Sequence, residues 1–199
     1  MAVTIKINPC PERYNSANPY KTGQTTSYAT NDDGDLERGR GSDFTTLDFN
    51  NPFGNTNRFT DTTGGQTYAN DIVIDWSTTN YINETVIGWY RVVQGGAGVN
   101  WATAMAAQPY TIGSYNDWYV PNVNELATIV LQEQSNVLDY SPFNLQPLNG
   151  VIWSTSTRAD NTGFAKVCAA TAGGIGNGSK TNNWNFLVLR YFTFTELGL

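Results

Sequence analysis

The stretch YNDWYVPNVNEL, residues 115–126, holds the clearest local signals in the chain. Asn122 and Glu125 stand three positions apart. This is the spacing of a capping box, in which each side chain accepts a hydrogen bond from the other residue's backbone N–H. Pro121 stands just before the cap, so a helix is predicted to begin after Asn122. Its apolar face would comprise Val123, Leu126, Ile129 and Val130. We expect this face and Trp118 to fill the core.

Residues 100–108, NWATAMAAQ, predict a second helix. Asn100 is a preferred N-cap residue, and Pro109 disfavours the helical conformation of the residue before it. Alanine supplies helix propensity, and apolar residues three and four positions apart form one face. The residues of this face are Trp101, Ala104 and Met105.

Runs of β-branched and aromatic residues predict strands before and after the helices. They lie at residues 3–7, 71–76, 85–93, 151–155, 164–169 and 186–194. The last run is apolar on both faces, so we expect it to be a central or oligomer-facing strand. We interpret residues 171–185 as a loop, and the glycine-rich stretches 95–98 and 173–176 as turns.

This order of elements predicts an α+β fold with two helices packed on small antiparallel sheets joined by long polar loops. Residues 1–45 consist largely of Pro, Gly and small polar residues, with few apolar residues that could anchor a core. We interpret residues 1–45 as an extended N-terminal arm used for attachment or oligomerisation. Residues 46–199 are predicted to form one domain.

The composition argues against several classes of function. The chain of 199 residues has a net charge of −6 and no histidine, which removes imidazole-activated nucleophiles and His-containing zinc sites. We expect no enzyme, metal or cofactor, although a hydrolase that uses only carboxylates stays open. Without a basic run, nucleic-acid binding is not expected, and no apolar segment is long enough for membrane insertion. No secretion signal is recognisable, and Cys10 and Cys168 are expected to be free thiols.

Three motifs resemble, in order and spacing, a lectin-like domain family named after the C-terminal domain of a bacterial collagen-like adhesin. Residues 115–126 resemble its G-D-W-R-L-P-x-x-x-E-L signature, WSTS at 153–156 its W-S-S-T, and Leu189-Arg190 its closing V-R. The helix at 100–108 looks like its W-x-x-A-x-x-A helix. Tyr119 stands where the family has Arg. The motif residues are expected to be structural: Trp101, Trp118, Pro121, Glu125, Leu126, Trp153, Ser154 and Arg190.

The resemblance implies a C-type-lectin-like fold and a role in recognition, since the family occurs in bacterial adhesins and in phage tail and fibre proteins. We therefore expect a non-catalytic phage virion component, a tail or head fibre-type receptor-binding or decoration protein made in the host cytoplasm. Its expected partners are other virion proteins, through the N-terminal arm, and a host-surface glycan or protein. A homotrimer is expected. The alternatives are a bacterial glycan-binding adhesin domain, which should carry a basic patch, and an architectural virion protein without a ligand.

Two polar loops, residues 157–162 and 173–185, are the expected ligand-binding surface because amide side chains stand there beside an aromatic ring. The candidate residues are Arg158, Asp160, Asn177, Lys180, Asn182, Asn183, Trp184 and Asn185. The alternative interpretation is a solvated loop with Trp184 turned inward. If the loops bind the target, alanine at Asn183 and Trp184 should abolish binding and leave the thermal midpoint nearly unchanged.

Overall fold

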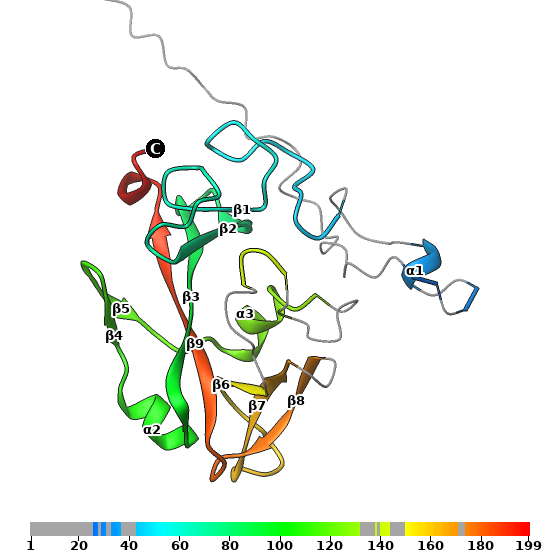
Figure 1. The fold of residues 1–199 in the computed structure, drawn as a ribbon, viewed down its shortest axis with the longest axis vertical. Helices are drawn as coiled ribbons and strands as arrows, with labels where there is room; N and C mark the ends of the chain where they lie inside the picture. The colour runs from blue at the N-terminus through cyan, green and yellow to red at the C-terminus, as the bar shows by residue number, and fades with distance from the viewer. Residues whose placement is uncertain are drawn as a thin grey trace, which may run out of the picture.

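Strands dominate the described part of the chain. The computed structural model describes residues 26–27, 29–30, 33–36, 43–131, 138, 140–143, 150–170 and 174–199. Within this part, strands account for 45% of the residues and helices for 11%. The protein is therefore mostly β, as the ribbon in Figure 1 shows.

Seven strands form one sheet in the order β1-β2-β3-β9-β6-β7-β8. Neighbouring strands pair antiparallel, except that β6 and β9 are parallel where Ile152 meets Asn185. The strands are β1 (Phe59–Thr60), β2 (Ile72–Asn80), β3 (Thr85–Val99), β6 (Val151–Thr157), β7 (Phe164–Ala169), β8 (Gly174–Ser179) and β9 (Trp184–Thr193). Because β9 lies between β3 and β6, the prediction of a central last strand is confirmed.

Short elements lie beside this sheet. The remaining elements are α1 (Asp33–Leu36), α2 (Trp101–Ala106), β4 (Tyr110–Ile112), β5 (Tyr115–Trp118), α3 (Val123–Ala127) and the 3-10 turn η2 (Thr195–Leu197). β4 and β5 pair as a separate two-stranded hairpin. In Figure 1, α2 and this hairpin lie on one side of the long β3–β9 pair, and α3 lies on the other.

The sheet is buried on both faces, so the molecule has two layers of core. Leu187 and Leu189 of β9 belong to the layer that includes Leu126 of α3. Val188 and Phe192 of β9 belong to the other layer, with side chains from α2 and the hairpin. Alternate residues of β9 point to opposite faces, so a strand that is apolar at almost every position fits only between two such layers.

Close packing between β3 and β9 depends on a glycine. A Cβ added to Gly88 would stand 2.3 Å from the ring of Phe192, which crosses the strand at that point. The ring fills the space where any other residue would have a side chain. This contact explains an isolated glycine within the otherwise β-branched and aromatic run of β3.

The predicted fold class is wrong. The structure is a mostly β protein with a seven-stranded sheet, and not an α+β C-type-lectin-like fold with two helices packed on small antiparallel sheets. The predicted helices form, but α2 is six residues long and α3 five. Residues 95–98, predicted to be a turn, continue β3, and β8 occupies most of the residues 173–176 that were also predicted to turn. Seven of the described strands therefore join into one sheet, and β4 and β5 pair separately.

Much of the predicted N-terminal arm lies outside the described residues, including the strand predicted at residues 3–7 and Cys10. At the boundary drawn after residue 45, Phe44 is buried and packs edge-on against Tyr140. The Arg58 guanidinium lies 4.4 Å from the centre of the Phe44 ring and forms a buried ion pair with Asp75. Residues 43–60 are thereby fastened to the sheet.

Candidate functional site

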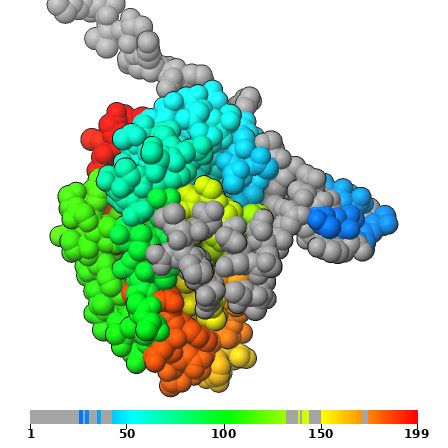
Figure 2. All heavy atoms as spheres, in the orientation of Figure 1, coloured from blue at the N-terminus to red at the C-terminus, as the bar shows by residue number. Residues whose placement is uncertain are grey.

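The predicted ligand-binding loops lie together at one end of the sheet. The loop predicted at 157–162 forms the turn after β6, at residues 158–163. The loop predicted at 173–185 is mostly strand, because residues 174–179 form β8 and residues 184–185 begin β9, and only residues 180–183 turn between them. The backbone N–H of Lys180 donates to the carbonyl of Gly163 at 2.9 Å and joins the two turns. Figures 1 and 2 show this end of the molecule opposite residues 43–70.

The charged side chains of these loops are held by other protein groups. Arg158 makes a two-point ion pair with Asp160, which raises the pKa of the arginine and lowers that of the aspartate. Lys180 donates to Thr157 Oγ1 at 2.8 Å, and its Nζ lies 3.7 Å from the centre of the Trp101 ring. A ligand that used these charges would first have to break these contacts.

The aromatic ring of the loop is turned inward. Trp184 lies 4.5 Å from Trp153, centre to centre, and it fills the space over Gly178, where an added Cβ would stand 1.9 Å from the indole. The Asn185 amide donates to the carbonyls of Gln94 and Gly96. Both residues therefore hold the sheet together.

Three of the predicted amides face solvent. Asn177, Asn182 and Asn183 are exposed, and their side chains have no hydrogen-bond partner among the residues that the structure describes. The structure thus brings the predicted loops together, but it leaves only these amides available to a ligand.

The motif residues occupy structural positions. Trp118, Trp153 and Leu126 are fully buried. The indole N–H of Trp101 donates to the carbonyl of Ser154, whose hydroxyl donates to the carbonyl of Lys166. The carbonyl of Pro121 accepts from Thr155 N at 2.8 Å, which fixes the start of α3 against β6.

Glu125 has a second role besides the cap. Its Oε2 accepts from the backbone N–H of Asn122, which completes the capping box. Its Oε1 accepts from the hydroxyls of Tyr119 at 3.3 Å and Tyr191 at 3.0 Å. Burial and the Glu125 carboxylate together raise the pKa of Tyr119. Tyr119, which stands where the resembling family has Arg, therefore meets this carboxylate as a neutral donor.

Arg190 is a buried clamp between β9, β5 and the C-terminal turn. Its Nε and Nη2 bind both carboxylate oxygens of Asp117, at 2.7 and 3.0 Å, and Nη2 also reaches Glu196 at 2.8 Å. The guanidinium carbon lies 4.2 Å from the ring centres of both Tyr115 and Phe192. Arg190 therefore fixes the orientation of Tyr115.

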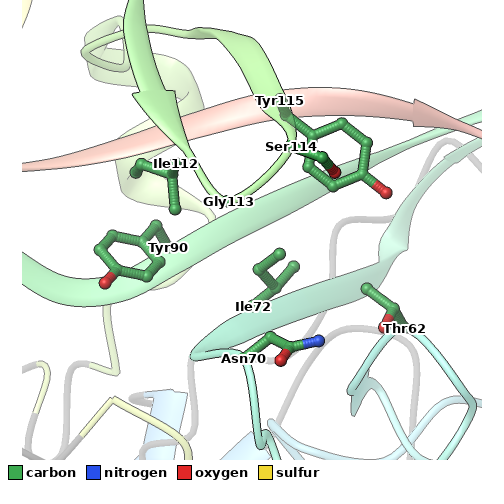
Figure 3. A pocket seen from close by; sticks show the side chains of 8 residues that line it. All are labelled: Thr62, Asn70, Ile72, Tyr90, Ile112, Gly113, Ser114 and Tyr115. Carbon is green, nitrogen blue, oxygen red and sulfur yellow. The ribbon is translucent and has the colours of Figure 1, made fainter.

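A pocket of about 380 Å³ lies between the tip of the β4–β5 hairpin, the start of β2 and the middle of β3. Figure 3 shows Ile72 in the middle of the lining residues, with Tyr90 and Ile112 to one side and Thr62 and Tyr115 to the other. Eight residues line it: Thr62, Asn70, Ile72, Tyr90, Ile112, Gly113, Ser114 and Tyr115. The volume is at the small end of the range for ligand sites, about 300–1,000 Å³.

The polar side chains of this pocket have no hydrogen-bond partner in the described residues. Five of the eight lining residues carry a hydroxyl or an amide, and none of these five side chains makes a hydrogen bond there. They are Thr62, Asn70, Tyr90, Ser114 and Tyr115. This arrangement differs from that of the predicted loops, whose charged groups are paired. Unpaired polar groups gathered around apolar surface are what a small-molecule site requires.

The pocket could not be predicted from a local sequence pattern, because its residues come from four separate parts of the chain. The one local signal was Gly113-Ser114, a turn pair between short apolar runs that is typical of a hairpin. A hairpin prediction there would have identified an exposed tip. It would not have indicated that the tip lies over Ile72 and Tyr90.

The charged side chains around the pocket are bound to one another. Arg91 binds Asp71 at 3.0 Å beside the start of β2, and Arg190 binds Asp117 and Glu196 behind Tyr115. No residue that lines the pocket carries a formal charge. The pocket therefore offers hydrogen bonds and aromatic rings without an ion-pairing group.

Among the described residues, no group of three or more His, Cys, Asp and Glu side chains could hold a metal ion. No helix there is long and apolar enough to cross a bilayer. Cys168 is a free thiol in the core, and burial raises its pKa to about 12.

Comparison with known families decides the assignment. Residues 74–190 match the family described as the Lcl C-terminal domain. The chain belongs to this family. The match confirms the family that the motifs at 115–126 and 153–156 predicted. It begins in β2 and ends in β9, so the Lcl C-terminal domain includes most of the sheet and the hairpin that forms the pocket. The comparison with curated proteins found no match.

Proposed function

We propose that this protein is a non-catalytic recognition component of a phage virion, and that it binds a host-surface molecule through the pocket under the β4–β5 hairpin. One observation carries the proposal: five hydroxyl and amide side chains line this pocket without a hydrogen-bond partner in the described part of the chain. Hydroxyl and amide groups that no protein group engages are free to exchange hydrogen bonds with a ligand that enters the pocket.

The virion setting rests on the family resemblance, because the family is represented in phage tail and fibre proteins. Attachment to other virion proteins through residues 1–45, and assembly as a trimer, are parts of the same proposal. The acidic net charge of −6 disfavours the alternative of an adhesin that binds polyanionic glycans. The further alternative, an architectural protein without a ligand, predicts that the pocket binds nothing.

Binding of the labelled protein to a panel of bacterial cells tests the proposal. The variant Asn70→Ala with Tyr115→Phe removes two hydrogen-bonding groups from the pocket. Asn83→Ala with Thr85→Val removes an amide and a hydroxyl from the turn and strand start between β2 and β3, away from both the pocket and the predicted loops, and serves as the control. We expect the wild type and the control to bind cells, and the pocket variant to lose most of the binding.

Two results would overturn the proposal. An architectural protein would bind no cell type, and would instead be retained by a particle assembled without it. An adhesin or loop-based recognition protein would bind cells equally well with either double variant. The mass of the isolated protein by native mass spectrometry tests the trimer, and turnover on a panel of glycosides tests for hydrolysis, for which we expect none.

A further inference from the structure

We infer that the ligand of the hairpin pocket is a neutral saccharide ring without acidic or basic substituents. This inference rests on the proposed function, since it names the ligand class of the same pocket. It follows from the lining side chains and from the charges behind them.

An anionic ligand lacks a cation to bind. The nearest arginines, Arg91 and Arg190, are each held by carboxylates at 2.7 to 3.0 Å. The side chain of Arg190 is only 6% exposed, so a ligand in the pocket cannot replace its partners. The partly exposed carboxylates of Asp71 and Asp117 add a field that repels negative charge. Sulfated and carboxylated sugars are therefore disfavoured.

A cationic ligand is disfavoured for a different reason. Aromatic rings that bind ammonium groups need a free electron-rich face. The Arg190 guanidinium already lies 4.2 Å from the centre of the Tyr115 ring, so this ring face is not free for a second cation. The other tyrosine, Tyr90, is in edge contact with Trp118 and gives only one ring, too few for a cage.

The remaining groups match a neutral sugar. A pyranose ring presents apolar C–H faces and a belt of hydroxyls that both donate and accept. The pocket supplies tyrosine rings and Ile72 for the faces, and hydroxyls that also donate and accept on Thr62, Ser114 and Tyr115. Asn70 adds an amide, which can donate and accept at once. The volume of about 380 Å³ suits one such ring more closely than a folded peptide segment.

The Arg190 clamp makes this wall rigid before the ligand arrives. Asp117 and Glu196 hold the guanidinium, and the guanidinium in turn supports the ring of Tyr115. Side chains that are ordered in advance lose less entropy on binding, which raises affinity for a small ligand. A site with one fixed aromatic wall is suited to a rigid ring.

The test is a titration of the full chain with methyl glycosides of glucose, galactose, mannose and N-acetylglucosamine, followed by isothermal calorimetry or NMR. Methyl glucuronide and a sulfated monosaccharide form the anionic arm, and choline forms the cationic arm. We expect at least one neutral glycoside to bind and the charged probes not to bind. The pocket variant Asn70→Ala with Tyr115→Phe should bind that glycoside about 10- to 30-fold more weakly, since each lost hydrogen bond costs about three- to sixfold. The control Asn83→Ala with Thr85→Val should bind it like the wild type.

Each other outcome overturns a specific part. Binding of only a charged probe, or equal binding by both double variants, contradicts the saccharide inference. A protein ligand would give a different set of results: cells bind the protein through the pocket, no glycoside binds, and protease treatment of the cells abolishes binding. The proposed function then stands, and this inference falls. If a neutral glycoside binds in the pocket but no cell type does, the inference stands and the proposed function falls.

Discussion

The rings of Trp153 and Trp184 lie with their centres 4.5 Å apart, at the end of the sheet where ligand-binding loops were predicted. Trp184 also covers the backbone of Gly178. Its indole is thus part of the packing between β6, β8 and β9. Trp184, the aromatic residue that suggested a binding surface, is needed to hold these strands together. Only the exposed amides of the polar loops are therefore available to bind a ligand there.

Gly178 gives a direct test of this packing. Alanine at Gly178 would place a Cβ 1.9 Å from the Trp184 ring, so we expect the free energy of unfolding to fall by about 1–3 kcal/mol. Gly176 on the same strand is the matched control, because its added Cβ would meet Val167 at 3.9 Å, an ordinary contact. Urea unfolding of both variants measures the difference. Equal stability of the two variants would show that Trp184 is not packed there.

Replacement of Trp184 by alanine should reduce stability as well as any binding. We expect a loss of about 3 kcal/mol in the free energy of unfolding, the lower end for a large aromatic residue because the side chain is half-buried. Asn183→Ala should change it by less than about 0.5 kcal/mol, since the side chain is exposed. Asn183→Ala is therefore the clean test of the predicted loops. If the Trp184→Ala protein kept its stability but lost target binding, the result would instead support ligand binding by the predicted loops.

The ion pair between Arg58 and Asp75 should be the most sensitive polar contact. The two side chains are 2% and 0% exposed. Asp75→Ala leaves a buried guanidinium without its carboxylate, so we expect a loss of about 3–5 kcal/mol. Adding Arg58→Met should recover part of that loss, because no buried charge then remains. Asp160→Ala is the control, because it removes the carboxylate of the exposed ion pair with Arg158 and should leave the free energy of unfolding unchanged in urea. A loss as large as that of Asp75→Ala would show that burial does not set the contribution of these ion pairs.

The Cys168 thiol should be unreactive in the folded protein. Burial raises its pKa to about 12, so at pH 8 the thiolate is about one part in ten thousand. In a Cys10→Ser background, iodoacetamide should modify Cys168 only in denaturant, as mass spectrometry can measure. The unfolded thiol ionises from about pH 9 and the folded one near pH 12, so ionisation favours unfolding as the pH rises through this range. Rapid alkylation at pH 8 without denaturant would contradict the burial.

Local signals in the sequence predicted much of the secondary structure. The caps at Asn100 and Asn122 set the start of α2 and α3, and apolar runs located β2, β3, β6, β7 and β9. The short strands β1, β4 and β5 were not predicted, and neither was β8, which has the sequence GIGNGS, in which glycine alternates with mostly polar residues. Glycine is required at Gly178 by the Trp184 ring, a contact that no local pattern reveals. The sequence predicted no strand at β8 and ended the strand at residues 85–93 before Gly95. The predicted strands were therefore assigned to small separate sheets.

The site was harder to predict for the same reason. Polar residues close together in sequence suggested the loops at 157–162 and 173–185, but composition does not tell whether such side chains are already paired. The pocket depends on contact between Ser114 and Tyr115 of the hairpin tip and Ile72 of β2, which are about 40 residues apart. Only the packing of the hairpin over the sheet brings them together.

The most direct test of the account maps where a ligand binds. Two-dimensional ¹H–¹⁵N NMR spectra, recorded while the best neutral methyl glycoside is added, report on every backbone N–H and asparagine amide. The account predicts the largest shift changes at the Asn70 side chain and at the backbone of Gly113 and Ser114. Changes centred on Asn182 and Asn183 would contradict it and return recognition to the loops at the other end of the sheet.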